Sequence, residues 1–381
     1  ALVFLSLLSA LPAPAFELVT HEDITSAAFA RSAASDVLRD LGVDPATRLS
    51  GGFLRGSRSP VDWLVQGARD EDDTISTNFA RYRNHFYDPV NNRGLTATAF
   101  GVIPIRGERA PDWALEDQEE FFTQAFSYRD ARLAFLMALI AGGPLDRETA
   151  LASTFEILGH VIHPLQDMAS PPHTRNDIHG GFGFGPTSLF ERYLDQAQVR
   201  RRLNFDGTPV RFGLPRQYWS TADGRGLAEF VNRNFVSEGT NFTTRVEGAI
   251  GGGYPNPVLR LGADDQGRPF ETTLDVQTQL EPGLRDRNGN LIDGSVTFFA
   301  NKFQDPISGA ALRNERMTTL SLFDRELERK GAALVFTLNR YNVEAQAAFL
   351  IPRAVGYSAG LLDHFFRGKL DVDLVPADPN D

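Results

Sequence analysis

Hydrophobic positions recur at helical spacing near the start of the chain. Apolar side chains fall every three or four residues until Gly42 ends the pattern. Thr20 and Asp23 have the spacing of a capping box, in which each side chain accepts a hydrogen bond from the other residue's backbone N–H. The pattern predicts one helix over residues 20–41 that begins at Thr20 and carries His21 in its first turn.

The same periodicity returns in the middle and near the end of the chain. Residues 115–141 and 146–168 form two helical patterns separated by a Gly-Gly-Pro turn, and Asp146 is placed to cap the second. Residues 315–367 return to long helical patterns, which Pro352 interrupts. The expected fold class is therefore mainly α, with several helices in one domain that spans residues 16–367.

The composition changes before the last helices. Residues 250–314 are rich in Gly, Pro, Asp and Asn, with short alternating runs such as SVTFFA, which predicts a loop-and-hairpin insertion. Within it, the run from Asp286 to Asp293 resembles part of a calcium loop, but it lacks the glycine at the sixth position and the closing glutamate of an EF-hand. A hairpin turn at Asn288-Gly289 is the simpler interpretation.

The two ends of the chain differ in composition from the rest. Residues 1–15 are apolar, have the length of a signal peptide and end in a small-x-small pattern. A buried first helix is the alternative, because no basic region precedes them. Cleavage after Ala15 would make Phe16 the first residue of a secreted or periplasmic protein. Residues 368–381 form an acidic, proline-containing tail that we expect to fray.

Charge and cysteine content narrow the function classes. The 381-residue chain has a formal net charge of -11, which disfavours a surface that binds duplex nucleic acid. It has no cysteine, so disulfides and thiolate metal sites are excluded. Any metal would be held by His, Asp and Glu, and these ligands suit zinc, manganese or iron.

Four of the seven histidines lie within twenty positions. In the helical pattern after residue 146, Glu156, His160, His163 and Asp167 share one face beside an apolar stripe. His163 and Asp167, at i and i+4, can point at one ion, although Pro164 between them favours a kink. We assign His160 to packing or to support of a ligand.

His173 and His179, six residues apart, follow in a proline-rich loop. The surface of an amphipathic helix would account for isolated polar residues, but it does not account for histidines beyond the helix. Earlier in the chain, Asp70 opens an acidic run, and His85 follows it by fifteen residues. Such a run is usually a solvated surface. Glu71 and Asp72 are alternatives to Asp70, because the spacing to His85 can slip by one or two residues.

These motifs resemble those of the trinuclear-zinc phosphodiesterase superfamily. The resemblance is carried by LGHVIHPLQDMASPPH, with His163, Asp167 and His173 in the order H-x3-D-x5-H, by THEDIT at His21 and by NHFYDP at His85. The superfamily contains bacterial zinc-dependent phospholipases C and fungal single-strand nucleases. The resemblance covers residues 16–195, and more loosely the last helices, and implies a multi-helix fold with up to three zinc ions.

The resemblance also implies which residues bind zinc. One ion would be held by Asp70, His85, His163 and Asp167. A second would be held by the backbone amino group and carbonyl of Phe16, by His21, and by Asp167 as a bridge. In the family the N-terminal residue is tryptophan. Its backbone binds the metal and its ring does not, so phenylalanine at this position is compatible with the site. Asp70 would also orient the attacking water.

The third zinc site departs from the family pattern. The phospholipases place a histidine four residues before a glutamate, whereas here Thr187 precedes Glu191 at that distance. His179 is the nearest substitute, twelve residues ahead of Glu191 across a glycine-rich loop. His173, His179 and Glu191 converge only if that loop folds back, and otherwise the third site is incomplete.

This set of ligands suits hydrolysis of phosphate esters, because zinc lowers the pKa of its bound water to about 7. The expected function is a phospholipase C-type phosphodiesterase, whose phospholipid substrate would bring it transiently to a membrane surface. Phe182 and Phe184 would contact an acyl chain, stack on a base or pack under the loop. A single-strand nuclease or nucleotidase is the first alternative. A catalytically weak, metal-stabilised binding protein is the second.

Overall fold

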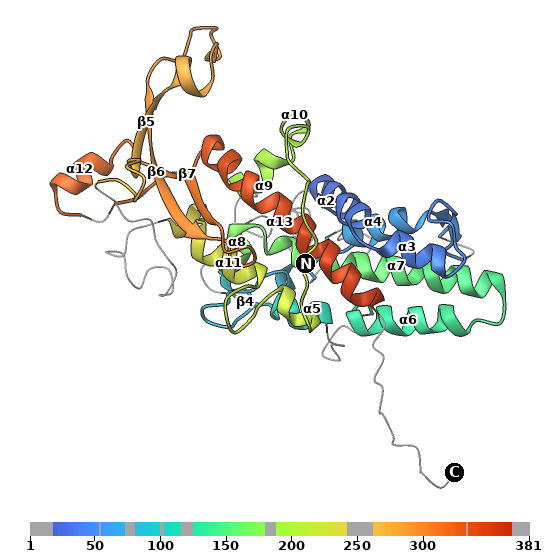
Figure 1. Ribbon diagram of the computed structural model, residues 1–381. Coiled ribbons are helices and arrows are strands. Elements are labelled where there is room, and N and C mark those ends of the chain that lie inside the picture. The colour runs from blue at the N-terminus through green and yellow to red at the C-terminus, as the bar shows by residue number, and fades with distance from the viewer. Residues whose placement is uncertain are drawn as a thin grey trace, which may run out of the picture.

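A long helix, α7 (Pro144–Asp167), runs through the middle of the helical body in the computed structural model (Figure 1). Every side chain from Thr154 to Asp167 on it is buried. The helices that pack against it are α2 (Leu18–Arg31), α4 (Pro60–Asp70), α5 (Ala110–Leu115), α6 (Tyr128–Ile140) and α13 (Arg340–Phe366). The structure describes residues 18–52, 55–72, 81–99, 103–115, 125–179, 188–241, 262–332 and 334–367.

Helices α4 and α7 cross with their backbones in direct contact. A Cβ atom added at Gly67 would overlap the carbonyl group of Glu156, and one added at Gly159 would overlap the carbonyl oxygen of Leu64. Only glycine therefore fits at either position without a shift of one helix. The crossing brings the end of α4, and the residues that follow it, against the histidine-bearing half of α7.

The first predicted helix is two helices in the structure. α2 is already helical at Leu18, so Thr20 lies inside it and does not cap it, and α3 (Ala34–Asp40) follows after a break. At the break, the backbone N–H of Ala33 donates to the carboxylate of Asp363 in α13 (2.6 Å). The prediction of one helix was wrong because a distant side chain binds the N–H that a continuous helix would use.

Two predictions about capping and proline were also wrong. Gly143, not Asp146, is the N-cap of α7, because Pro144 occupies the first helical position, where its missing N–H is not needed. α13 continues through Pro352, as α7 continues through Pro164. Burial of both helices on several sides outweighs the loss of one backbone hydrogen bond in each.

The predicted hairpin insertion contains a three-stranded antiparallel sheet with the order β5-β6-β7. Its strands are β5 (Glu271–Asp275), β6 (Ser295–Gln304) and β7 (Ala311–Thr319), and the sheet extends away from the helices (Figure 1). Strand β7 occupies residues 315–319, where a helix was expected. Phe299 packs there in a small separate core with Leu334 and Phe336.

The segment that resembles a calcium loop is a tight turn. The carboxylate of Asp286 accepts hydrogen bonds from the backbone N–H groups of Asn288 (2.8 Å) and Asn290 (2.9 Å). Gly289 has a φ of 84°, which favours glycine. These contacts fit the hairpin-turn interpretation.

Short elements complete the described part of the chain, and together the sheets make the fold mixed α/β rather than purely α. Two further two-stranded sheets pair β1 (Leu49–Ser50) with β2 (Ser57–Arg58) and β3 (Thr96–Ala99) with β4 (Ile103–Arg106). The remaining helices are α8 (Pro171–Thr174), α9 (Leu189–Leu194), α10 (Ala197–Arg200), α11 (Leu227–Asn234), α12 (Asp324–Arg329), the 3-10 helices η2 (Tyr82–Asn84), η3 (Pro215–Tyr218) and η4 (Glu238–Thr240), and the π-helix η6 (Val276–Leu280).

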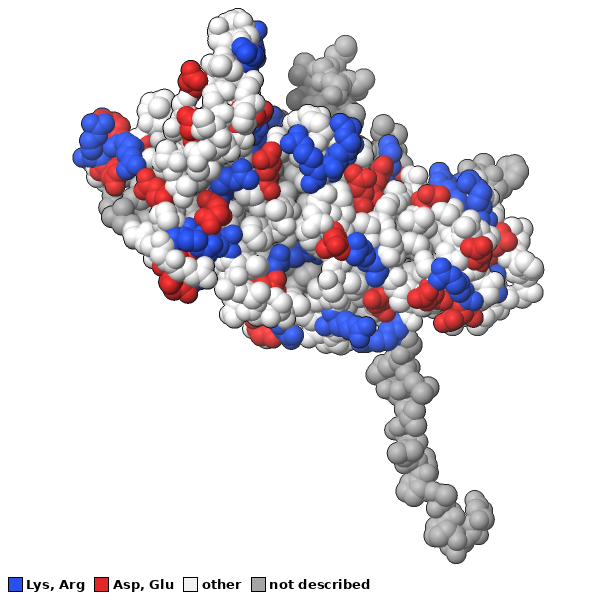
Figure 2. Space-filling view, turned by 45° about the horizontal axis from the view of Figure 1, so that its top comes forward, with Lys and Arg blue, Asp and Glu red and all other residues white. Residues whose placement is uncertain are grey.

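The surface of the molecule is mixed in charge. Figure 2 shows Lys and Arg side chains interspersed with Asp and Glu over the face displayed. Among the described helices, none is both long and apolar enough to span a membrane. Residues 1–15, expected to form a signal peptide, lie outside the described residues, as do Phe16, residues 242–261 and the tail 368–381.

Candidate metal centre

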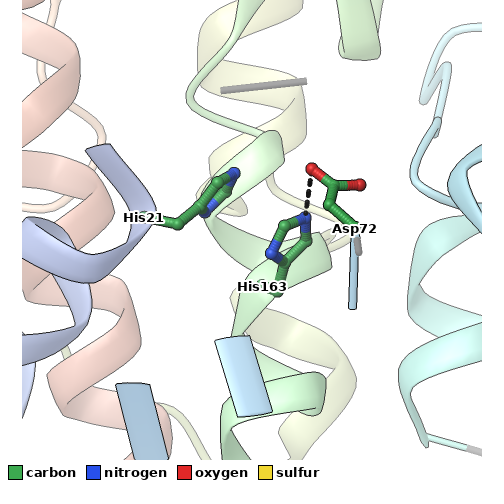
Figure 3. Close-up of side chains that lie close together, drawn as sticks. All are labelled: His21, Asp72 and His163. Atoms are coloured by element: carbon green, nitrogen blue, oxygen red, sulfur yellow. Dashed lines mark ion pairs between the residues drawn. The ribbon is translucent and has the colours of Figure 1, made fainter. Parts of the chain in front are cut away.

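Five buried side chains from distant segments meet at the end of α7. Helix α7 supplies His163 and Asp167, and α2 supplies His21. Asp72 lies just after α4, and His85 just after η2. Figure 3 shows His21, Asp72 and His163 gathered from their three segments. Each of the five is nearly or fully inaccessible to solvent.

The carboxylate of Asp167 lies between histidines from different segments. Its Oδ1 is 3.3 Å from His21 Nε2, and its Oδ2 is 3.2 Å from His85 Nδ1 and 3.4 Å from His163 Nε2. Asp72 approaches two of the same rings, with Oδ1 3.2 Å from His85 Nδ1 and Oδ2 3.3 Å from His163 Nε2. The two oxygens of Asp167 are thus placed to contact two neighbouring ions.

A second cluster forms where α8 and α9 approach each other. His179 Nε2 lies 2.9 Å from Glu191 Oε2, and His173 Nε2 lies 3.6 Å from Glu191 Oε1. The donor atoms of these three residues converge. Residues 180–187, which include Thr187, Phe182 and Phe184, lie outside the described residues. The departure from the family spacing therefore does not keep these three side chains apart.

His173 lies in α8 rather than in the expected loop, and contacts from a neighbouring segment hold the residues between it and His179. The guanidinium of Arg175, fully buried, donates to the hydroxyl of Thr240 (2.6 Å) and to the carbonyl of Asn232 (2.8 Å). The carboxylate of Asp177 accepts from the backbone N–H of Gly239 (2.7 Å). Arg175 and Asp177 are thereby fixed relative to α11 and η4.

Four histidines have one ring nitrogen held by an oxygen atom that is not one of the cluster carboxylates. The Nδ1 atoms of His21, His163, His173 and His179 lie 2.6, 2.6, 3.0 and 2.9 Å from Gln166 Oε1, Ala68 O, His85 O and Asp177 O respectively. An oxygen acceptor keeps the proton on Nδ1, so the Nε2 lone pair points toward the carboxylates. Histidines that bind metals are usually oriented in this way.

Several buried atoms in the clusters make no hydrogen bond to the described residues. They are His85 Nδ1, His163 Nε2, His173 Nε2 and both carboxylate oxygens of Asp167. Buried polar atoms are normally paired, because leaving one unpaired is unfavourable. The donor atoms form three groups, each with its members within 4.8 Å of one another, and a cation in each group would pair them. The residues present therefore fit bound metal ions.

The charges of the clusters shift the pKa values of their histidines. Burial lowers the pKa of His163, but Asp72 and Asp167 outweigh burial and raise it to about 10. Burial likewise opposes protonation of His179, but Glu191 raises its pKa to about 9. Without a metal, protons on these histidines balance the buried carboxylates, so a bound cation would replace protons.

The structure does not place Asp70 with the histidines. Asp70 is the last residue of α4, is half-buried and accepts a hydrogen bond from Gln66 Nε2 (2.6 Å). The helix ends there, and the following turn directs Asp72 into the cluster instead. Of the two alternatives that the sequence left open, Asp72 approaches both His85 and His163, whereas Glu71 approaches only His85 of these two.

The remaining histidines lie outside the clusters. His160 stacks on Phe126, with 4.1 Å between the ring centroids, and its Nδ1 lies 2.6 Å from Glu71 Oε2. His364 lies 3.1 Å from both the hydroxyl of Tyr128 and the carbonyl oxygen of Gly213. The contacts of His160 agree with the packing or supporting role expected for it.

One serine motif was overlooked at the level of sequence. Residues 356–360, GYSAG, match the G-x-S-x-G pattern of a nucleophile elbow. Ser358 is fully buried in the middle of α13, whereas an elbow requires a sharp turn between a strand and a helix. The helical setting excludes this serine as an elbow nucleophile.

Comparison with known proteins gives no relative for this chain: no family model, no curated protein and no solved structure matches it. The candidate site is therefore defined by the buried His, Asp and Glu groups, which lie within metal-binding distance of one another.

Proposed function

We propose that this protein is a zinc-dependent hydrolase of phosphate esters, and specifically a phospholipase C-type phosphodiesterase. The observation that supports this most strongly is the position of Asp167, whose two oxygens face His21 on one side and His85 and His163 on the other. A buried carboxylate in this position can bridge two cations. Neighbouring cations suit a phosphodiester, which brings negative charge to them.

The first two proposed ligand sets follow the contacts of Asp167, because the first two groups of donor atoms share His163, and the third set is the third group. The first ion would be held by Asp72, His85, His163 and Asp167, the second by His21 and Asp167, and the third by His173, His179 and Glu191. Nitrogen and oxygen donors of this kind suit zinc. When bound, zinc supplies a water of lowered pKa and a positive charge for the phosphate oxygens.

In this proposal the chain's own residues orient the reactants. Asp72 takes the role first expected of Asp70, because its carboxylate is the one beside His85 and His163. It would accept a hydrogen bond from the attacking water and so direct that water at phosphorus. The oxygen atoms at Nδ1 of His21 and His163 keep their Nε2 atoms facing inward.

We further propose a phospholipid substrate, transient contact with a membrane surface, and a secreted or periplasmic location. Its test is zinc-dependent release of phosphocholine from phosphatidylcholine vesicles, measured beside release of nucleotides from single-stranded DNA. We expect phosphocholine release that falls by at least about 100-fold in Asp72→Asn. Asp70→Asn is the matched control, two residues away and outside the clusters, and should keep nearly full activity.

Other outcomes select the alternatives. Release of nucleotides alone would favour the single-strand nuclease. Bound zinc without turnover of either substrate would contradict the enzymatic proposal and favour a metal-stabilised binding protein. Loss of activity in Asp70→Asn but not in Asp72→Asn would contradict the assignment of the carboxylate.

A further inference from the structure

The buried carboxylate of Glu71 lies beside the candidate metal centre and contacts the side chains around it. Glu71 Oε1 accepts a hydrogen bond from Trp113 Nε1 (2.8 Å) and lies 3.2 Å from His85 Nε2. Glu71 Oε2 forms an ion pair with Arg81 and lies 2.6 Å from His160 Nδ1. With both oxygens engaged in this way, Glu71 belongs to none of the three donor groups.

Aromatic rings hold this carboxylate and its partners in place. The guanidinium of Arg81 lies 4.9 Å from the ring centroid of Trp113 and 5.4 Å from that of Phe126. Phe126 also stacks on His160. The side chain of Glu71 is fully buried, and that of Arg81 is 5% exposed. Because the pair is neutral as a whole, Glu71 can be fixed beside the metal centre without adding net negative charge to it.

The contact with Glu71 reverses the orientation of one histidine. His85 directs Nε2 at Glu71, which leaves Nδ1 3.2 Å from both Asp72 Oδ1 and Asp167 Oδ2. The four other histidines of the clusters have Nδ1 held by an oxygen atom and Nε2 directed inward. His85 is therefore set to offer the opposite ring nitrogen.

We propose that Glu71 is a positioning residue that holds His85 with its proton on Nε2, so that Nδ1 is the atom offered to the metal. A carboxylate in this position also makes the imidazole a stronger ligand. The inference deepens the proposed function and rests on it. Removing such a partner typically lowers metal affinity by about 10- to 100-fold.

The test uses two double variants, of which one keeps and the other removes the oxygen acceptor for His85 at residue 71. Glu71→Gln with Arg81→Met removes both buried charges and keeps an amide oxygen near His85 Nε2. Glu71→Ala with Arg81→Met removes both charges and the acceptor. Asp264→Asn, which breaks the ion pair with Arg313 in the sheet region, controls for the loss of a paired buried carboxylate elsewhere.

Zinc affinity is measured by competition with a chromophoric chelator. We expect affinity for one of the ions to fall about 10- to 100-fold in the alanine double variant. The glutamine double variant should recover most of that loss, and Asp264→Asn should bind zinc as the wild type does. Equal affinities in the two double variants would overturn the inference.

The second measurement needs no variant, so it stands even if a double variant does not fold. Long-range 1H–15N correlation spectra of zinc-loaded wild type distinguish histidines bound through Nδ1 from those bound through Nε2. We expect His85 bound through Nδ1 and the other cluster histidines bound through Nε2. Binding of His85 through Nε2 would overturn the inference and leave the proposed function intact, whereas a wild type that binds no zinc would remove the proposed function itself.

Discussion

Asp167 shows at the scale of a single residue why the clusters fit metal ions. Its carboxylate is fully buried, contacts three histidines and makes no hydrogen bond within the described part of the chain. The neighbouring histidines keep its pKa well below the ordinary value, although burial alone would raise it. A charged, buried carboxylate of this kind requires positive charge close to both of its oxygens.

The first prediction concerns this carboxylate. Asp167→Asn should lower the zinc content from about three ions per chain to about one, because its oxygens face His21 on one side and His85 and His163 on the other, and it contacts none of the third ligand set. Elemental analysis of desalted protein measures this. Asp146→Asn, an exposed carboxylate in the first turn of the same helix, should leave the zinc content unchanged. Equal zinc contents in the two variants would contradict the bridging role.

The second prediction concerns pH. The pKa values of His163, about 10, and His179, about 9, are raised in the folded protein, so their protonation stabilises the metal-free fold fully below pH about 6.5. That contribution is lost as the pH rises through 9 to 10. We expect the thermal midpoint of chelator-treated protein to fall across this range, with a smaller fall when zinc replaces the protons. A midpoint that does not change with pH in the chelated protein would contradict the assignment.

The sequence could predict part of the site at this scale. Helical periodicity places His163 and Asp167 on one face whatever the rest of the chain does. It cannot choose among three consecutive acidic residues, because the choice depends on α4 ending at Asp70. The role proposed for Glu71 was not predictable either, because its partners Arg81 and His160 are brought to it only by the fold.

At the scale of elements, the crossing of α4 and α7 positions the centre. The contact at Gly67 and Gly159 lets the carbonyl of Ala68 in α4 reach His163 Nδ1 on α7. The same approach brings the end of α4, and with it Asp72, to the face that carries Asp167. The positions of the candidate ligands thus depend on two glycines that are not themselves candidate ligands.

The third prediction tests this crossing. Gly159→Ala should force the helices apart, lower the free energy of unfolding by about 1–3 kcal/mol and weaken zinc binding. Gly142→Ala, in the turn before α7, is the matched control, because an added Cβ there meets no atom within 4 Å. Denaturant unfolding and zinc titration of both variants provide the comparison. A Gly159→Ala variant as stable as Gly142→Ala would show that the close contact is not required.

Elements were predicted well where the pattern is local and poorly where a distant partner decides. The periodicity of α7 and the turn before it were sufficient to place that helix. The break between α2 and α3 was not predictable, because it depends on Asp363, 330 residues from Ala33. Strand β7 replaced an expected helix over residues 315–319 because β6 pairs with it, an example of tertiary context overriding propensity.

At the scale of the whole molecule, the candidate ions connect segments that are far apart in the chain. Ligands come from α2, from the turns after α4 and η2, from α7, and from the region of α8 and α9. The three-stranded sheet packs partly around a small core of its own and partly, through Phe303, against the main core, and it supplies no candidate ligand among the described residues. Metal binding should therefore stabilise the helical body as a unit.

The fourth prediction follows from this linkage. Removing zinc with a chelator should lower the thermal midpoint, since a ligand at 100 times its Kd stabilises the folded state by about 2.7 kcal/mol. Differential scanning calorimetry measures the shift, and added zinc should reverse it. Added magnesium should not, because it prefers an all-oxygen octahedral site. An unchanged midpoint after zinc removal would contradict the role of the metal in the fold.

The most direct test of the central claim is the metal content of the purified protein. After desalting into metal-free buffer, elemental analysis should give about three zinc ions per chain, one for each proposed ligand set. One zinc ion per chain, or none even after incubation with excess zinc, would contradict the proposed metal centre and the function inferred from it.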